Sequence, residues 1–194
     1  LSGNTDLLEK TKLDNKIMQL EREHAIFKKE RIRAEYKLTA NREEMEKASR
    51  MAARMTQDME YITSYTGNRT TLLLNMPQAT AEETGRELHR IAKTYRSGAY
   101  GTIGSYAGLN LLVRSEYTID GIFDRNTFFV EGTDGLKYRC GMSGALPLGF
   151  VESAQYPQNT LKRLSVLIEG QQEKIAKLES EVPALQGIID RNWN

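Results

Sequence analysis

The chain has 194 residues, of which 39% are hydrophobic and 27% are charged, and its 27 lysines and arginines nearly balance its 26 aspartates and glutamates. This composition excludes an intrinsically disordered chain but is leaner in apolar residues than one compact core usually is. The net charge of +1 excludes a global field that would attract the whole chain to nucleic acid or to an anionic membrane, so any such surface must be local.

A long helix is predicted for the first segment, residues 1–65. Residues 6–62 contain no proline or glycine, and apolar residues recur there in alternating steps of four and three, which is the heptad pattern of a coiled coil. Polar residues interrupt this seam and would either fix its register or leave it locally open. The seam positions are Leu13, Ile17, Leu20, His24, Phe27, Arg31, Ala34, Leu38, Asn41, Met45, Ala48, Ala52, Met55, Met59 and Ile62.

Residues 66–158 predict a small α+β insert. Thr80 with Glu83 three residues later has the form of a capping box, and an amphipathic helix follows that Gly98 is expected to stop. Alternation over residues 109–117 predicts a strand, and "TFFVEGTDGLKYRC" predicts two more strands around a turn. We expect an antiparallel sheet of three or four strands with the helix packed on its apolar face.

The last segment, residues 159–194, repeats the heptad pattern. Because two heptad helices flank one insert, we expect the second to return along the first as a long antiparallel coiled-coil hairpin. Pro183 is expected to kink or end this helix, since proline lacks a backbone donor. The second seam consists of Leu161, Leu164, Ile168, Gln171, Ile175, Leu178, Val182, Leu185 and Ile189.

The glycine-rich stretch "SGAYGTIGSYAG" at residues 97–108 poses the question of a phosphate-binding loop. Such a loop needs G-x-G-x-x-G between a strand and the start of a helix, or a lysine followed by serine or threonine. Here the glycines at 98, 101, 104 and 108 follow a predicted helix and precede a predicted strand. We therefore expect them to serve the end of the helix, the start of a strand and close backbone packing.

No residue pattern predicts catalysis or metal binding. His24 and His89 are the only histidines, and the single cysteine, Cys140, has no paired Cys/His spacing for zinc and is expected to be a half-buried structural thiol. A single cysteine also cannot form an internal disulfide, so a reducing, cytoplasmic setting is the default. No apolar run reaches the length of a signal-peptide core or a membrane span. We expect no cofactor.

Two sets of basic residues are candidates for contact with nucleic acid phosphates. The alternative is an ordinary solvated surface, because Glu116 and Glu131 share the face of the second set. Phe129 on that face is a candidate for base stacking. The first set, on the helix, is Arg86, Arg90 and Lys93, and the second set, on the strands, is Arg114, Lys137 and Arg139.

Four stretches together resemble the C-terminal region of very large bacterial proteins that combine an N-6 adenine DNA methylase with a Swi/Snf-type helicase and are often carried on conjugative elements. They are "LSGNTDLLEKTKLDNKIMQLEREHAIFKKER", "YGTIGSYAGLNLLVRSE", "NTFFVEGTDGLKY" and "LIEGQQEKIAKLESEVPALQ". The resemblance implies that the chain is a fragment and that any ATP-dependent helicase or adenine methyltransferase activity lies elsewhere in the parent. It carries no catalytic residue onto this chain.

These observations predict a non-catalytic accessory module of a DNA-processing protein. Its expected partners are DNA, the remainder of the parent polypeptide and a second copy through the coiled coil, with no membrane. The alternative is a purely structural or self-associating coiled-coil module, and an enzyme that uses the glycine stretch is a distant third.

Overall fold

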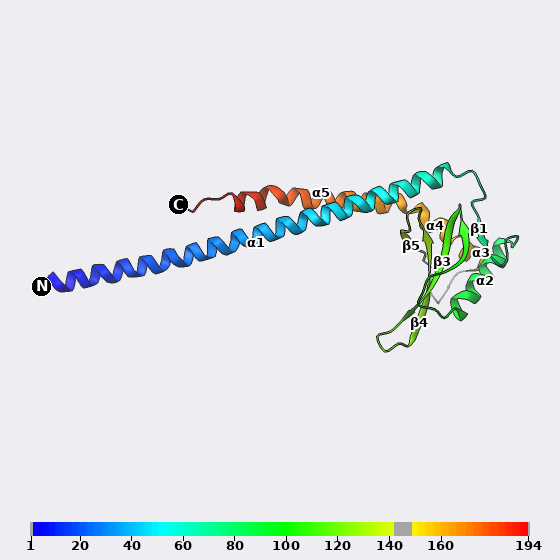
Figure 1. Ribbon diagram of the computed structural model, residues 1–194, viewed down its shortest axis with the longest axis horizontal. Coiled ribbons are helices and arrows are strands. Elements are labelled where there is room, and N and C mark those ends of the chain that lie inside the picture. Colours follow the sequence, from blue (N-terminus) through cyan, green and yellow to red (C-terminus); the bar gives the residue numbers. More distant parts are fainter. Residues whose placement is uncertain (1, 142–148, 194) are drawn as a thin grey trace. The chain divides into compact units, whose positions relative to one another are not determined.

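A computed structural model describes residues 2–141 and 149–193 of the chain (Figure 1). Its contacts divide the chain into two compact units. The first unit comprises Leu1–Ser49 with Gln172–Asn194, and the second comprises Arg50–Gln171. The long helix α1 (Ser2–Ser64) and the last helix α5 (Leu164–Ile189) each contribute to both units.

The second unit is built on an antiparallel sheet of five strands in the order β1-β2-β3-β4-β5. The predicted α+β class is confirmed, whereas the expectation of three or four strands is wrong. The additional edge strand has only three residues, too few to show an alternation in the sequence. The strands are β1 (Thr71–Leu73), β2 (Gly101–Tyr106), β3 (Leu109–Tyr117), β4 (Phe123–Glu131) and β5 (Lys137–Arg139).

Helix α2 (Ala81–Thr94) begins with the predicted capping box, because the Thr80 side chain accepts from the Glu83 amide while the Glu83 carboxylate accepts from the Thr80 amide. The helix ends at Thr94 with an extended C-cap at Tyr95, so Gly98 does not stop it. The amide of the Asn126 side chain on β4 donates instead to the carbonyls of Ile91, Ala92 and Tyr95, which accounts for the earlier end.

One face of the sheet forms the core of the second unit. Leu111, Val113, Phe128 and Val130 of the central strands are fully buried there. The expectation of one packed helix is wrong, because the same cluster contains residues from several helices besides α2. These helices include α4 (Tyr156–Lys162), and α3 (Phe150–Ala154) packs beside α2. The helical residues of the cluster are Met55, Leu88, Ile91, Ala92, Leu161, Leu164 and Ile168.

In the first unit, α1 and α5 pack against each other in opposite directions. Ala34 and Leu38 of α1 form a buried cluster with Leu185 of α5. Ion pairs follow the same antiparallel order, from Glu30 with Arg191 at 4.0 Å, through Lys37 with Glu181 at 2.8 Å, to Glu44 with Lys174 at 2.7 Å. Closer to the N-terminus of α1, the rings of His24 and Phe27 have their centres 5.0 and 5.5 Å from the centre of the Trp193 ring.

Pro183 does not end the last helix, since α5 continues through this residue to Ile189. Pro183 and Glu179 are both exposed, so water can reach the carbonyl of Glu179, which loses its helical donor. No helix within residues 2–141 and 149–193 is both long enough and apolar enough to cross a membrane.

Candidate functional site

The glycine stretch forms β2 and the turn that joins it to β3. A side chain on Gly104 would overlap the backbone carbonyl oxygen of Leu72 on the neighbouring strand, so this glycine is needed for close strand packing. Ala107 and Gly108 have φ angles of 48° and 75° and form the two-residue hairpin turn. The stretch therefore belongs to the sheet and does not lie at the start of a helix, where a phosphate loop would place it.

The two other residue types considered for catalysis are held in structural contacts. Cys140 is buried, and burial raises the pKa of its thiol to about 11, which makes it a poor nucleophile. His89 Nε2 lies 2.9 Å from Ser153 Oγ, and burial lowers the pKa of the imidazole. No three His, Cys, Asp or Glu side chains gather in a metal-binding arrangement in the part of the chain that the structure describes.

The helical basic set lies on α2 and is largely paired with carboxylates of the same helix. Arg86 binds Glu82 at 2.6 Å and also stacks on the ring of Phe150, with its guanidinium carbon 4.6 Å from the ring centre. Arg90 makes two hydrogen bonds, of 2.6 and 2.7 Å, to the carboxylate of Glu87. Lys93 is exposed in the last turn.

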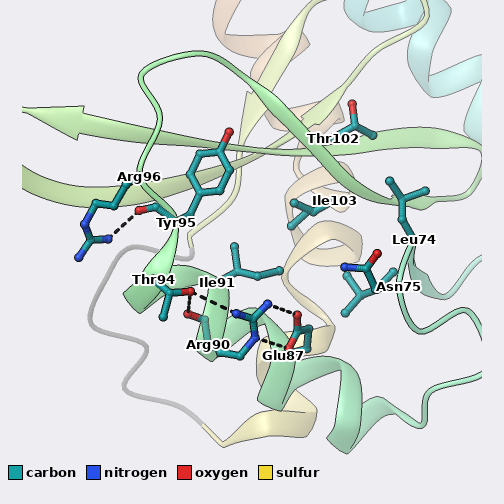
Figure 2. A pocket seen from close by; sticks show the side chains of 11 residues that line it. Leu74, Asn75, Glu87, Arg90, Ile91, Thr94, Tyr95, Arg96, Thr102 and Ile103 are labelled. Carbon is teal, nitrogen blue, oxygen red and sulfur yellow. Dashed lines mark hydrogen bonds and ion pairs between the residues drawn. The ribbon is translucent and has the colours of Figure 1, made fainter.

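A cavity of about 490 Å³ lies between α2 and the β1–β2 edge of the sheet. Figure 2 shows Arg90 in its wall, turned toward Glu87 and Thr94, and Arg96 hydrogen-bonded to the carbonyl of Tyr95 at 2.6 Å. The Arg96 guanidinium also lies 3.6 Å from the ring centre of Phe123. Because both cations are committed to neighbouring groups of the protein, the cavity offers little to attract an anionic ligand.

The strand basic set gathers on the open face of the sheet around an aromatic pair. The rings of Tyr100 and Phe129 meet edge to face with centres 5.3 Å apart. The guanidinium carbon of Arg114 lies 5.0 Å from the centre of the Tyr100 ring, and Nζ of Lys137 lies 4.9 Å from it. Arg139 is directly opposite Phe129 in the β4–β5 register and so shares its face. We call Tyr100, Arg114, Phe129, Lys137 and Arg139 the Tyr100 cluster.

The two rings of the aromatic pair differ in their exposure to solvent. Phe129 is buried, whereas 41% of the Tyr100 surface is exposed. Leu112, which pairs with Phe129 across β3 and β4, is also buried on this face. Phe129 and Leu112 thus form an apolar base, and the ring of Tyr100 stands above it toward solvent.

Two carboxylates accompany the cations of the cluster. Glu131 accepts from Asn110 at 3.0 Å and lies 3.3 Å from Lys137, and these hydrogen bonds lower the pKa of its carboxyl despite partial burial. Glu116 lies 3.7 Å from Arg139. Arg114 has no carboxylate within ion-pair distance among residues 2–141 and 149–193, and its hydrogen bond of 3.4 Å goes to the Tyr100 hydroxyl. Arg114 is therefore the cation of this face most available to an anion.

The structure separates the two basic sets. Helix α2 contacts the core face through Leu88, Ile91 and the carbonyls that bind Asn126, whereas Arg114, Lys137 and Arg139 alternate with core residues and point to the opposite face. The three strand residues therefore converge on one place, and the three helix residues belong to another surface.

Sequence reasoning missed Tyr100, the exposed aromatic ring of the cluster. It directly precedes β2 and stands among glycines, so no alternation marks its side. The only available signal was its position one residue before a strand that pairs with β3, because the two strands then bring Tyr100 near Arg114.

Comparisons with known proteins bear on the second unit. No curated protein and no solved structure matches the chain. The sequence model of one family, described as a domain of unknown function (DUF8438), matches residues 56–161, a span that includes the whole sheet, α2 and the Tyr100 cluster. The chain belongs to this family of domains.

Proposed function

We propose that this chain is a non-catalytic accessory module of a DNA-processing protein and that it contacts DNA through the Tyr100 cluster. The observation that carries the proposal is the exposed ring of Tyr100, whose centre lies 5.0 Å from the guanidinium carbon of Arg114 and 4.9 Å from Nζ of Lys137. A nucleotide offers a base that stacks on an aromatic ring and a phosphate that attracts neighbouring cations. The cluster presents partners for both groups within one small area.

The pairing of the charges favours the sheet face over the helix face. On α2, two of the three basic residues already bind carboxylates of their own helix at 2.6 Å. On the sheet, Lys137 and Arg139 lie 3.3 and 3.7 Å from their carboxylates, and Arg114 has no carboxylate within ion-pair distance among the described residues. A phosphate therefore displaces fewer strong contacts on the sheet.

The nature of the parent protein rests on the resemblance to methylase–helicase fusion proteins. On this proposal the ATP-dependent motor and the methyltransferase lie in other parts of a cytoplasmic polypeptide, and this chain holds DNA for them. The balanced charge of the chain fits a local contact, because a global field would not direct DNA to one face.

The second part of the proposal is that α1 and α5 pair as an antiparallel coiled-coil hairpin. Its support lies in the agreement between the heptad pattern and burial. In the first unit Ala34, Leu38 and Leu185 at seam positions are buried, and the seam residues Ile175, Leu178 and Val182 are half-buried. Asn41, a polar seam residue, is buried and donates to Glu181 at 3.1 Å, which suits a role in fixing register.

Two triple variants with the same change of charge test the DNA contact. The sheet variant carries Arg114→Gln, Lys137→Gln and Arg139→Gln, and the matched helix variant carries Arg86→Gln, Arg90→Gln and Lys93→Gln. Binding of fluorescent single-stranded and duplex oligonucleotides is measured at several salt concentrations. Each phosphate contact that is lost should lower the slope of log affinity against log salt by about 0.7 for a single strand and about 0.9 for a duplex.

We expect the sheet variant to bind more weakly, with a salt slope reduced by the amount for up to three lost phosphate contacts. We expect the helix variant to bind like the unchanged chain. Equal losses in the two variants would mean that net charge alone is responsible. Absence of binding by the unchanged chain at low salt would overturn the DNA proposal and leave the structural coiled-coil module.

A further inference from the structure

The N-terminal part of α1 carries an apolar stripe that no other element covers within the described part of the chain. Leu13, Ile17 and Leu20 are 61, 53 and 47% exposed. They occupy the same heptad positions as Ala34 and Leu38, which are buried against Leu185 of α5. The stripe is therefore the direct continuation of an interface that already exists in the first unit.

The end of α5 sets the limit of that interface. Helix α5 stops at Ile189, and Trp193 beyond it still contacts His24 and Phe27. Among the described residues, the seam on the N-terminal side of His24 thus continues past the contacts made by Trp193. Exposed leucine and isoleucine in a sustained heptad register are the usual basis of helix association.

We propose that a second copy of this chain covers the stripe and that the two copies of α1 pair in parallel. In heptad terms Leu13 and Leu20 occupy d positions and Ile17 occupies an a position. A β-branched residue at a with leucine at d favours a parallel two-stranded coiled coil.

The charges beside the stripe favour the parallel direction. In a parallel pair of helices, the residue directly before each heptad position a lies beside the residue five positions later in the partner helix. Around Leu13, Ile17 and Leu20, Lys16 then faces Glu21 of the other copy and Glu23 faces Lys28, while Glu9 with Asp14 is unfavourable. The next residue before an a position, Glu30, already pairs with Arg191 of its own chain. Each combination occurs twice by symmetry, so favourable pairs outnumber unfavourable ones.

The antiparallel direction is less favourable. When Ile17 packs against Leu20 of an antiparallel partner, Asp14 faces Glu21 of the other copy, and Lys16 with Glu23 is the one favourable combination among the same residues, against two in the parallel pair. If the antiparallel register is shifted by one heptad, His24 and Phe27 would pack between the two copies of α1. The ring of Trp193 already packs against both of these side chains.

Sedimentation equilibrium over a range of concentrations tests the association with two matched double variants of the full chain. Leu13→Asp with Leu20→Asp places two charges in the stripe. Ile26→Asp with Ile32→Asp changes two exposed apolar residues that lie off the seam. We expect the unchanged chain and the off-seam variant to reach the mass of two chains, and the seam variant to keep the mass of one.

The direction is tested by a cysteine at a d position. Leu13→Cys should form a disulfide-linked dimer under mild oxidation, because identical residues face each other in a parallel pair, whereas Lys12→Cys on the outer side of the helix should not. The native Cys140 is buried and does not compete. A chain that stays single at every concentration, an equal loss in both double variants, or a dimer in which Leu13→Cys does not cross-link would overturn the inference. Trp193 fluorescence reports whether the first unit stays folded in each variant.

Discussion

The hydroxyl of Tyr138 on β5 donates a hydrogen bond of 2.6 Å to Oδ2 of Asp58 on α1, and 80 residues separate the two in sequence. Asp58 is fully buried, and its Oδ1 accepts from the amide and the hydroxyl of Thr133, both at 2.7 Å. A buried carboxylate is costly unless its oxygens are hydrogen-bonded, so these donors join α1 to the β4–β5 turn. That turn leads directly to Lys137 of the Tyr100 cluster.

Tyr138→Phe removes one donor from the buried carboxylate of Asp58. We expect the free energy of unfolding to fall by about 1.5–3 kcal/mol, the usual range for a hydrogen bond to a charged group. Urea denaturation measures the change. The control is Tyr117→Phe at the exposed end of β3, for which we expect less than about 0.5 kcal/mol. Equal effects of the two variants would show that the bond to Asp58 contributes nothing.

Asn126→Ala removes the amide that binds the last carbonyls of α2. The side-chain nitrogen donates to Ile91, Ala92 and Tyr95 at 3.2, 3.0 and 2.9 Å, and its oxygen accepts from Ser115 at 2.7 Å. Because these buried groups would lose their partner, we expect a loss of about 2–3 kcal/mol. Asn110→Ala, on the exposed face of β3, is the matched control. A small effect at Asn126 would mean that water replaces its amide.

Gly104→Ala places a methyl group against the carbonyl of Leu72, whereas Gly98→Ala meets only the Tyr117 ring at 3.9 Å. We expect the first variant to separate β1 from β2 and to lose about 1–3 kcal/mol, and the second to be nearly neutral. Reaction of Cys140 with a thiol reagent measures the loss of stability of the whole unit, because this buried thiol lies beyond β5 at the opposite edge of the sheet and is protected until the unit unfolds. Equal labelling rates in the two variants would contradict close strand packing at Gly104.

The pairing of α1 with α5 in the first unit should weaken in acid. Hydrogen bonds from Lys174 and Lys47 lower the pKa of Glu44 from 4.5 to about 2, and those from Lys37 and Asn41 lower the pKa of Glu181. A carboxyl with a lowered pKa in the folded state stabilises fully above its unfolded pKa and loses this contribution as the pH falls through the folded value. We expect helix melting temperatures, followed by circular dichroism, to fall between about pH 4.5 and pH 2.

Lys174→Gln removes the contact between the helices at Glu44 and should flatten part of this acid dependence. Lys47→Gln, which removes a contact within α1, is the control and should change it less. A pH profile that is the same in the unchanged chain and in Lys174→Gln would show that the Glu44 pair does not stabilise the helix pairing.

Periodic patterns predicted much of this architecture because they report local geometry. The heptad positions Ala34, Leu38 and Leu185 are buried, and the capping box of Thr80 and Glu83 is present. Features that depend on distant partners were not predicted. Asn126 finds its acceptors 31 to 35 residues away, in the last turn of α2 and at its C-cap. No local pattern indicates that a polar residue in a strand will end a helix.

The same reasoning explains the partial prediction of the site. Strand alternation assigned Arg114, Lys137 and Arg139 to one face, and the register brings them together. Alternation did not single out Tyr100, because neighbouring glycines hide its orientation. It also could not rank the two basic sets, because the strength of the pairs that Arg86 and Arg90 form with Glu82 and Glu87 is visible only in the structure.

The most direct test of the central claim is the affinity of the Tyr100→Leu variant for a short single-stranded oligonucleotide at fixed low salt. Base stacking on an aromatic side chain contributes about 1–3 kcal/mol per base, so we predict about a 5- to 150-fold weaker affinity with an unchanged salt slope. Tyr117→Leu, which removes another exposed aromatic ring from the same sheet, should bind as the unchanged chain does. Equal affinities for Tyr100→Leu and the unchanged chain would contradict the assignment of the Tyr100 cluster as the DNA contact.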